Sequence, residues 1–483
     1  MKTYRKPLLY LLLFSLLLLA TAPAPRTRFN GPGGPQGRAY LPLLLAPQSG
    51  QTGSPPASGQ PLIHLPYFAD RPVYHQAAVF WFGRVKGVEN YADVRIGYTD
   101  EVLFLRLTII DQHLWYDTRP TPAEMEAWDA AAVYLHIGDG AGGRLQERSY
   151  RFVAQLDGWE GRSGYEAVYQ GSASGWRPIS HSGFSRSGWR GNGPNNNSRE
   201  DRGHLLTFEI PFSALGLSGP PRQGERWKLA LNVYDRDDAA GAVRGLQRWP
   251  TAFSETNPDT WGDISFGMPV YQAPDLPVDQ VVALRHGVNG VTIRDASVGG
   301  STNCGGKVDF WNEWGDTSYP GAEHLNVQNQ NDVSDFPCFS KLYITIPLDS
   351  LPRGRAILSA KLILNQSGNA TSFDSGEKLN SLIQAGVVAQ DWNEATLSWN
   401  NAPLLEQNIS QTWVTPVIDW PGWPGIPYTW DVSLAAARAY ASGQPLRLVL
   451  YSADNFGPNG KYFYSSDAGM AGRPTLQVEL GRP

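Results

Sequence analysis

Residues 94–110 read Val-Arg-Ile-Gly-Tyr-Thr-Asp-Glu-Val-Leu-Phe-Leu-Arg-Leu-Thr-Ile-Ile. Residues 94–98 alternate between apolar and polar, Thr99-Asp100-Glu101 has the composition of a turn, and an apolar run follows from Val102 to Ile110. This pattern predicts two antiparallel β-strands joined by a short connection. Further segments of the same kind follow at 133–137, 149–156, 205–210 and 227–234.

The second half of the chain repeats the strand pattern. Strand-like segments cover 281–284, 339–348, 357–364, 446–451, 463–466 and 473–478. Residues 434–442, followed by Gly443, form the only convincing helical pattern. The Gly-, Ser- and Asn-rich stretch 171–203, which contains Trp176 and Trp189, is expected to be a long loop.

Composition supports an all-β protein and excludes several classes. The 483 residues include 51 Gly and 37 Pro, 18% are charged, and there are 17 Trp, 21 Tyr and 18 Phe. The net charge of −5 lacks the basic field of a nucleic-acid binder. The Gly and Pro content excludes a long helical bundle, and the aromatic content excludes a wholly disordered chain. We therefore predict an all-β fold with two antiparallel, jelly-roll-like β-sandwich domains.

The N-terminus has the pattern of a secretory signal peptide. Lys2, Arg5 and Lys6 precede the apolar run Leu8–Leu19, and Ala20-Thr21-Ala22 supplies small residues for cleavage after Ala22. The alternative is an uncleaved anchor, but the run is shorter than the about 20 residues that a membrane span needs. We predict an exported protein, extracellular or associated with the cell surface, with no membrane span after cleavage.

The signal peptide is followed by a stretch that cannot build a core. Residues 23–62 are rich in Pro, Gly and Ser, which predicts a disordered linker. Strand signals begin after this linker and continue to about residue 268. The expected organisation is a signal peptide (1–22), the linker (23–62), a first sandwich (63–268), a hinge (269–277) and a second sandwich (278–483).

The first sandwich resembles the family 9 carbohydrate-binding modules. The matching segments are Ala92–Ile96 with Leu103–Asp111, Trp128–Ile137, Phe208–Gly216, Trp227–Asp237, and Trp249-Pro250 with Pro258–Phe266. Each segment is weak alone, but their order is specific and the resemblance covers about 200 residues. It implies a β-sandwich that binds sugars by aromatic stacking.

The second sandwich resembles the DNRLRE-type domain, which overlaps carbohydrate-binding module family 96. The most specific match is Trp392-Asn393-Glu394-Ala395-Thr396-Leu397-Ser398-Trp399-Asn400, continued by Asn401-Ala402-Pro403. Trp430-Asp431-Val432-Ser433 and the final Pro474-Thr475-Leu476-Gln477-Val478 follow in family order. The resemblance implies a jelly-roll-like sandwich of exported polysaccharide-active and surface proteins, and it fixes no ligand.

Aromatic side chains are the best candidates for a binding site, because a flat ring buries the apolar face of a sugar while nearby polar groups bind its hydroxyls. Most Trp side chains in a sandwich are nevertheless core residues. The resemblance makes Trp128 the first stacking candidate, and Trp249, Phe253 and Trp261 lie near the family's second aromatic position. The predicted carbohydrate-binding set is Trp128, Tyr134, Trp249, Phe253, Trp261, Trp420 and Trp423.

The chain departs from family 9 at two positions. The acidic residues that follow the family's Trp fall here on Ala131 and Tyr134. Two interpretations therefore stay open: the first sandwich binds a different sugar, or it is a scaffold that no longer binds sugar. Trp420 and Trp423 in the second sandwich belong to a Pro- and Gly-rich segment, so a binding rim or packing over a sheet edge are both consistent with them.

Two further features concern metal binding and covalent structure. Asp235, Asp237 and Asp238 follow a strand and supply oxygen ligands suited to calcium, whereas a solvated acidic turn is the simpler alternative. A structural calcium ion is the one cofactor that the sequence leaves open. Cys304 and Cys338 are the only cysteines, and an even pair in an exported chain predicts a disulfide; two buried free thiols are the alternative.

No catalytic constellation stands out. None of the eight His forms a zinc-protease helix motif, and no Gly-x-Ser-x-Gly elbow occurs. Gly138–Gly143 matches G-x-G-x-x-G, but a strand follows it instead of a helix, so it reads as a hairpin turn. The favoured function is non-catalytic binding of a polysaccharide or cell-wall glycan by two tandem modules. The alternatives are a structural or adhesion protein and, third, a hydrolase or lyase with an unrecognised site; the oligomeric state stays open.

Overall fold

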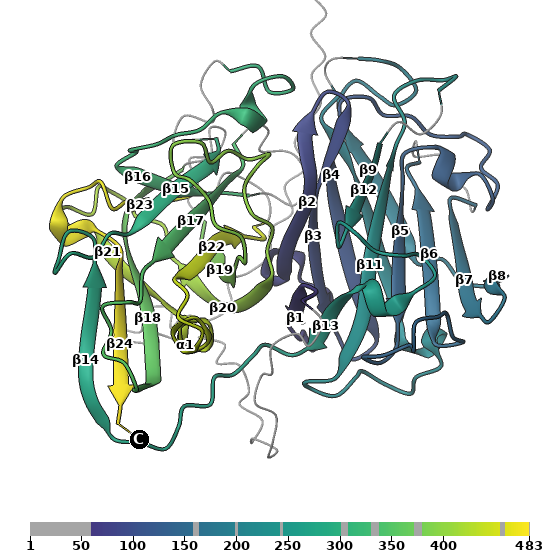
Figure 1. The fold of residues 1–483 in the computed structure, drawn as a ribbon. Helices are drawn as coiled ribbons and strands as arrows, with labels where there is room; N and C mark the ends of the chain where they lie inside the picture. Colours follow the sequence, from purple (N-terminus) through teal and green to yellow (C-terminus); the bar gives the residue numbers. More distant parts are fainter. Residues whose placement is uncertain are drawn as a thin grey trace, which may run out of the picture. The chain divides into compact units, whose positions relative to one another are not determined.

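The computed structural model describes residues 59–157, 164–198, 201–241, 245–300, 308–329, 338–370, 379–454 and 459–482. Its elements are nearly all strands, with one α-helix and short 3-10 turns among the described residues (Figure 1). The predicted all-β fold with antiparallel sandwiches is therefore confirmed. The predicted signal peptide and most of the predicted linker lie outside the described residues.

The strands of the first half run from residue 62 to residue 266. They are β1 (Leu62–Leu65), β2 (Ala78–Lys86), β3 (Glu89–Tyr98), β4 (Val102–Ile110), β5 (Ala130–His136), β6 (Ser149–Gln155), β7 (Glu166–Ser172), β8 (Gly175–Ile179), β9 (Ser185–Arg190), β10 (Gly203–Pro211), β11 (Arg226–Asp235), β12 (Gly245–Trp249) and β13 (Gly262–Phe266).

The second half contains the remaining strands and the helix. They are β14 (Val278–Arg285), β15 (Arg294–Gly299), β16 (His324–Val327), β17 (Ser340–Ile346), β18 (Ala356–Asn369), β19 (Ser381–Val387), β20 (Gln407–Val414), β21 (Ile426–Asp431), α1 (Ser433–Ala441), β22 (Leu446–Ser452), β23 (Lys461–Tyr464) and β24 (Thr475–Gly481).

The hairpin predicted from residues 94–110 is present as β3 and β4. The two strands are antiparallel, with Val94 opposite Leu107 and Tyr98 opposite Leu103. Thr99 closes the turn, since its side-chain hydroxyl accepts hydrogen bonds from the backbone N–H groups of Glu101 and Val102, each at 3.1 Å. The alternation of apolar and polar residues therefore sets both the strands and their register.

Two layers of strands form the first sandwich. One is the five-stranded sheet β2-β3-β4-β10-β9, and the other is the run β13-β11-β5-β6-β7-β8 of a larger sheet. Phe80, Val94 and Leu105 from the first layer are fully buried against Val133 and Leu231 from the second. The prediction of a long loop at 171–203 was wrong, because β8 and β9 lie within this range.

The second sandwich is built in the same way. The strand run β15-β17-β22-β19-β20 faces the sheet β14-β24-β18-β23-β16, to which β21 is added through β18. Its core is the aliphatic cluster around Leu342, Leu362, Leu448 and Leu476, closed by Trp430. Helix α1 was predicted within one residue of its observed ends, and it packs on β18 (Figure 1).

Strand β1 joins the two sandwiches into one sheet. It is parallel to β13, with Leu62 to Leu65 opposite Asp263 to Phe266, and at Leu62 it also pairs with Gln407 of β20. The backbone N–H of His64 donates to Asn408 Oδ1 (2.7 Å), and Asn408 Nδ2 donates to the His64 carbonyl (2.8 Å). One of the three described sheets, with 13 strands, therefore runs through both halves. The predicted domain boundaries themselves stay a prediction.

A buried aromatic cage forms a second contact between the halves. The Lys341 Nζ atom on β17 lies 3.3 Å from the ring centre of Trp399 and 4.5 Å from that of Trp81. Tyr91 and Tyr451 complete the cage at 4.8 and 5.1 Å. Because Trp81 and Tyr91 come from the first half and the other residues from the second, this cluster ties the two cores together.

Cys304 lies outside the described residues, so the predicted Cys304–Cys338 disulfide stays a prediction. Within the described part of the chain, no helix has the length and apolar character needed to cross a bilayer.

Candidate functional site

Successive side chains of β5 and β11 point to opposite faces of the sheet and therefore lie in two environments. Ala131, Val133 and Leu135 face the core between the two layers, whereas Ala130, Ala132 and Tyr134 belong to a separate cluster on the opposite side of the sheet. On β11 the same alternation places Ala230 and Tyr234 in that second cluster. We call this side of β5, β6 and β11 the outer face.

Asn232 lies at the centre of a hydrogen-bond network on the outer face. Its Nδ2 is 3.2 Å from the hydroxyl oxygens of both Tyr134 and Tyr234, and 2.9 Å from Glu255 Oε1. The Tyr234 hydroxyl donates to Glu126 Oε1 at 2.8 Å. Asn232 Oδ1 has no hydrogen-bond partner among the described residues. Asn232 is fully buried, so an acceptor left in this way costs about 1–3 kcal/mol.

Two ion pairs lie beside this network. Arg151 pairs with Glu126, and Arg248 lies 3.6 Å from Glu255. All four side chains are partly exposed, from 14% for Arg151 to 36% for Arg248 and Glu255. The formal charges cancel, so the outer face offers many hydrogen-bonding groups and little net charge.

Aromatic rings surround the same network. The Tyr134 ring lies 5.5 Å from Phe253, 5.7 Å from Trp261 and 6.0 Å from Trp176. The Trp261 indole N–H donates to the Ser254 carbonyl at 2.7 Å, which fixes this ring beneath the loop that carries Phe253. Rings held next to hydrogen-bonding groups are the combination that a sugar site requires.

The structure brings three of the predicted residues together but buries them. Tyr134 and Trp261 are fully buried, and Phe253 is 7% exposed. They form the floor of the outer face, and the partly exposed side chains above them are Glu126, Arg151, Tyr169, Trp176, Arg248 and Glu255. Sequence reasoning did not place any of these at the site, and Trp176 was assigned to a loop. The alternation of β5 was the signal that could have pointed to this face.

Trp249 lies on the other side of the sheet. It is 2% exposed, and its ring centre is 4.4 Å from that of Phe80 in the sandwich core. Gly262 is required beneath it, since a Cβ there would lie 2.5 Å from the indole. Trp249 therefore packs in the core and cannot contact a ligand on the outer face.

Trp128 is half-buried and has one covered ring face. The Arg236 guanidinium lies 3.8 Å from the ring centre. It is held there by hydrogen bonds to the carbonyls of Ala127, Asp238 and Ala239. A sugar that stacks on Trp128 would have to use the opposite ring face.

The acidic residues form a centre at one end of the sandwich, with different members from those predicted. Asp235 and Asp237 are joined by Asp111, and Asp111 is also grouped with Asp129 and His204; within each group of three the ligand atoms lie within 4.8 Å of one another. All five residues are buried. Asp238 is not part of this centre: its Oδ1 accepts a hydrogen bond from the Ala240 backbone N–H at 3.0 Å.

Burial controls the protonation of this centre. It raises the pKa values of Asp111 and Asp129 well above the ordinary aspartate range, and the neighbouring carboxylates raise them further. Burial also lowers the pKa of His204 to about 3, so its ring is neutral. Neither ring nitrogen of His204 has a hydrogen-bond partner among the described residues. Grouped carboxylates with a neutral imidazole fit a divalent cation, and the excess of oxygen ligands favours calcium.

The centre links both layers of the sandwich. Asp111 follows β4 and His204 lies on β10, both in the five-stranded sheet, whereas Asp129 precedes β5 and Asp235 ends β11 in the other layer. Backbone N–H groups of Trp115 and Arg236 donate to Asp129 at 2.6 and 2.8 Å. A cation bound here would hold the two layers together next to Trp128.

Trp420 and Trp423 are 68% and 49% exposed in the segment between β20 and β21. Both indoles are therefore accessible, and their predicted role in sugar binding stays a prediction.

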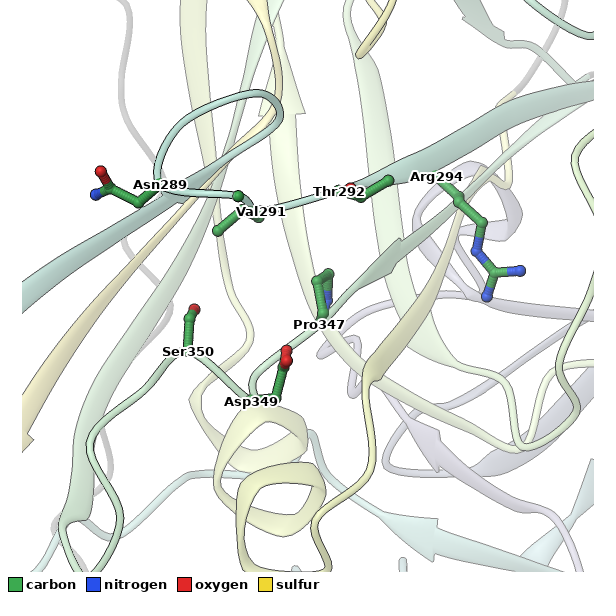
Figure 2. Close-up of a pocket in the computed structure, with 8 residues that line it drawn as sticks. Asn289, Val291, Thr292, Arg294, Pro347, Asp349 and Ser350 are labelled. Atoms are coloured by element: carbon green, nitrogen blue, oxygen red, sulfur yellow. The ribbon is translucent and has the colours of Figure 1, made fainter.

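The pocket in Figure 2 lies elsewhere and has a different character. It encloses about 460 Å³ and is lined by Asn289, Val291, Thr292, Pro347 and neighbouring residues of the second half. Arg294 points away from the labelled group, and its guanidinium donates to the Trp392 carbonyl and to Asp391. None of the described residues that line this pocket is aromatic, so they provide no stacking surface.

A second pocket of about 300 Å³ opens at an edge of the first sandwich. It is lined mainly by apolar side chains, among them Tyr150, Phe152 and Phe184. His181 at its rim lies 3.6 Å from Glu166. This pocket shares no lining residue with the outer face or with the acidic centre.

No protein-family model matches the chain, and no curated protein matches it. Among solved structures, a family 9 carbohydrate-binding module from Caldicellulosiruptor kristjanssonii in complex with glucose is 14% identical, with a TM-score of 0.30. The match covers 44% of this chain and 100% of the module. The same module in complex with cellotriose is 13% identical, covers 45% and 100%, and has a TM-score of 0.30. A protein from Bacteroides uniformis ATCC 8492 is 12% identical, covers 43% and 99%, and has a TM-score of 0.33. These TM-scores are low.

Proposed function

We propose that the protein is an exported, non-catalytic polysaccharide-binding protein and that the outer face holds the sugar. The observation that carries this proposal is the charge-balanced network of Glu126, Arg151, Asn232, Arg248 and Glu255 among fixed aromatic rings. Sugars combine hydroxyl groups with apolar C–H faces, and this surface offers partners for both.

Each part of the outer face has a definite task in this proposal. Glu126 and Glu255 accept hydrogen bonds from sugar hydroxyls, and Arg151 and Arg248 donate to hydroxyl oxygens. Trp176 is half-buried and lies at the side of the network, where it offers a ring for stacking. The buried Tyr134 and Trp261 keep these groups in place instead of touching the ligand.

Affinity electrophoresis tests the location of the site. In native gels cast with a panel of neutral polysaccharides, we expect one of them to retard the full-length protein. Trp176→Ala and Glu255→Gln should reduce this retardation at least tenfold, measured as the apparent dissociation constant. Glu101→Gln is the matched control, because Glu101 is exposed at the β3–β4 turn. No retardation by any glycan would contradict the proposal and favour the structural or adhesion alternative.

We also propose that calcium binds at Asp111, Asp129, Asp235 and Asp237, with His204 beside them. The ion would neutralise the grouped carboxylates and join the two layers. It has no catalytic role in this proposal, and the residues themselves are positioned by β4, β5, β10 and β11.

Thermal unfolding tests the cation site. After EDTA treatment, calcium should raise the unfolding midpoint, since a ligand at 100 times its dissociation constant adds about 2.7 kcal/mol. Asp111→Asn should abolish this increase, whereas Asp238→Asn should retain it, because Asp238 lies outside the centre. An equal response of both variants would contradict the assigned ligands. Zinc and magnesium, titrated in the same way, report which cation the centre prefers.

A further inference from the structure

The stretch 413–426, from the end of β20 through the connecting loop to the first residue of β21, carries an unusual concentration of exposed apolar side chains. Trp413, Trp420 and Trp423 are 45%, 68% and 49% exposed, and Ile418 and Ile426 lie in the same fourteen-residue stretch. Soluble proteins rarely expose such a set without a binding partner. The outer face lies in the first sandwich, so this segment is a separate feature.

Hydrogen bonds and backbone geometry fix the shape of this segment. Asn369 Oδ1 accepts from the Val417 N–H at 2.6 Å, and the Tyr428 hydroxyl accepts from the Thr415 N–H at 3.1 Å. Gly425 N–H donates to the Gly422 carbonyl at 2.8 Å, and both glycines have positive φ, which closes a tight turn around Trp423. The indoles of Trp420 and Trp423 are therefore presented by an ordered loop, whereas Trp413 lies on β20, and this order lowers the entropy lost on binding.

Trp423 is held in place at one side of its ring. Its ring centre lies 4.9 Å from that of Tyr464, in an edge-on arrangement. Gly469 and Gly472 lie directly against the indole, since a Cβ on either would come within 3 Å of it. Half of the side chain stays exposed even so. A ring seated on backbone with its remaining surface open has the form of a stacking platform.

The near absence of charged residues in this segment limits the class of ligand that it can bind. Between Trp413 and Trp430 the sequence contains one charged residue, Asp419, and no Lys or Arg. Acidic polysaccharides, nucleic acids and anionic lipid surfaces all need basic residues, so they do not fit here. A neutral polysaccharide needs only aromatic faces and backbone or hydroxyl groups, which this loop supplies.

We propose that Trp413, Trp420 and Trp423 form a second glycan-binding surface that takes extended, neutral polysaccharide chains independently of the outer face. This inference rests on the proposed function. The outer face and the indole surface, made of these three Trp residues, would then engage one polymer together. Linked sites of this kind raise the overall affinity for a polymer but not for a short sugar.

The test uses the full-length protein and two matched sets of variants. Affinity electrophoresis is run with neutral xylan, β-glucan and galactomannan, and with alginate as the acidic comparison. We expect Trp420→Ala/Trp423→Ala to weaken retardation by the neutral polymer at least tenfold, while binding of a short oligosaccharide of the same sugar, measured by calorimetry, is unchanged. Ile418→Ala is the control, because it removes an exposed apolar side chain from the same segment but no ring. Circular dichroism confirms that each variant is folded.

The outcomes separate this inference from the proposed function. If Glu255→Gln weakens both polymer and oligosaccharide but the double Trp variant changes neither, the indole surface is not a glycan site and the proposed function stands. If no variant or wild-type protein binds any neutral glycan, both fail. If the double variant converts an oligomer to a monomer in light scattering without a change in retardation, the surface is a protein interface and the inference is overturned.

Discussion

Tyr134 illustrates how a single position on a strand sets what a side chain can do. Its place in β5 turns it away from the core that holds Val133 and Leu135. Alternation alone predicts this. Its burial beneath Phe253, Trp261 and Trp176 depends on segments that are distant in sequence, and no local pattern shows it. The sequence therefore shows which face of the strand Tyr134 occupies, but not whether its ring is exposed on that face.

Asp295 gives a prediction that belongs to one residue. Burial raises its pKa to about 8, whereas an unfolded aspartate has a pKa of about 3.9. The native state therefore binds the proton more tightly, and this contribution to stability falls as the pH rises above about 4 and is fully lost once the pH has passed about 8. Asp295→Asn keeps the shape of the protonated form, including the hydrogen bonds with Ser466. We expect the variant to lose less stability than wild type between pH 6 and pH 9.

Urea unfolding at several pH values measures this difference directly. Asp349→Asn is the control, because Asp349 is exposed. A wild-type protein whose stability changes with pH in parallel with Asp295→Asn would show that this carboxyl group keeps an ordinary pKa in the native state.

At the scale of elements, the strongest sequence patterns predicted strands well and weak ones failed. β3, β4 and α1 have clear periodicity and appear where expected. β8 and β9 were missed because Gly175, Ser185 and Gly188 carry little strand preference; these strands form by pairing with β7 and β10. The grouping of the acidic residues shows a similar limit: Asp235 and Asp237 are two residues apart in sequence, whereas Asp111 and Asp129 lie at the ends of other strands, so no local pattern joins them.

The contact between the β20–β21 segment and the turn at 469–472 can be tested by adding one methyl group. Gly469 has φ −58°, so its backbone accepts alanine, but a Cβ would lie 2.8 Å from the Trp423 ring. Gly469→Ala should therefore displace the Trp423 ring and destabilise the protein by roughly 1–3 kcal/mol, as overpacking does. In a Trp423→Ala background the same change should be nearly neutral. This cycle, measured by urea unfolding, should give a coupling energy; additive effects would show that the ring does not rest on Gly469.

At the scale of the whole molecule, two sandwiches were predicted as separate modules, but they share a sheet. Strand β1 has only four residues and follows a Pro- and Gly-rich stretch, so the local sequence does not predict a strand there. Its pairing with both β13 and β20 depends on two segments more than 140 residues apart. The aromatic cage around Lys341 could not be predicted for the same reason. Its rings come from both halves of the chain, and no sequence motif joins them.

Cooperativity between the halves is the consequence that can be measured. The Gln384 side chain on β19 accepts from the Val79 N–H at 3.2 Å and donates to the Val79 carbonyl at 2.7 Å, so it bridges the two sandwiches. We expect the full-length protein to unfold in one calorimetric transition. Gln384→Ala should lower the midpoint of that whole transition, because it leaves buried backbone groups of Val79 unpaired at about 1–3 kcal/mol.

Gln280→Ala is the matched control, since Gln280 is exposed on β14 and should leave the midpoint unchanged. Two separate transitions, with only one of them shifted by Gln384→Ala, would show that the sandwiches unfold independently and that the shared sheet adds little to their stability. A single shifted transition would mean that a ligand or cation bound in the first sandwich also stabilises the second, because N-state binding stabilises the entire cooperative unit. Calcium added to the EDTA-treated protein should then raise one common midpoint.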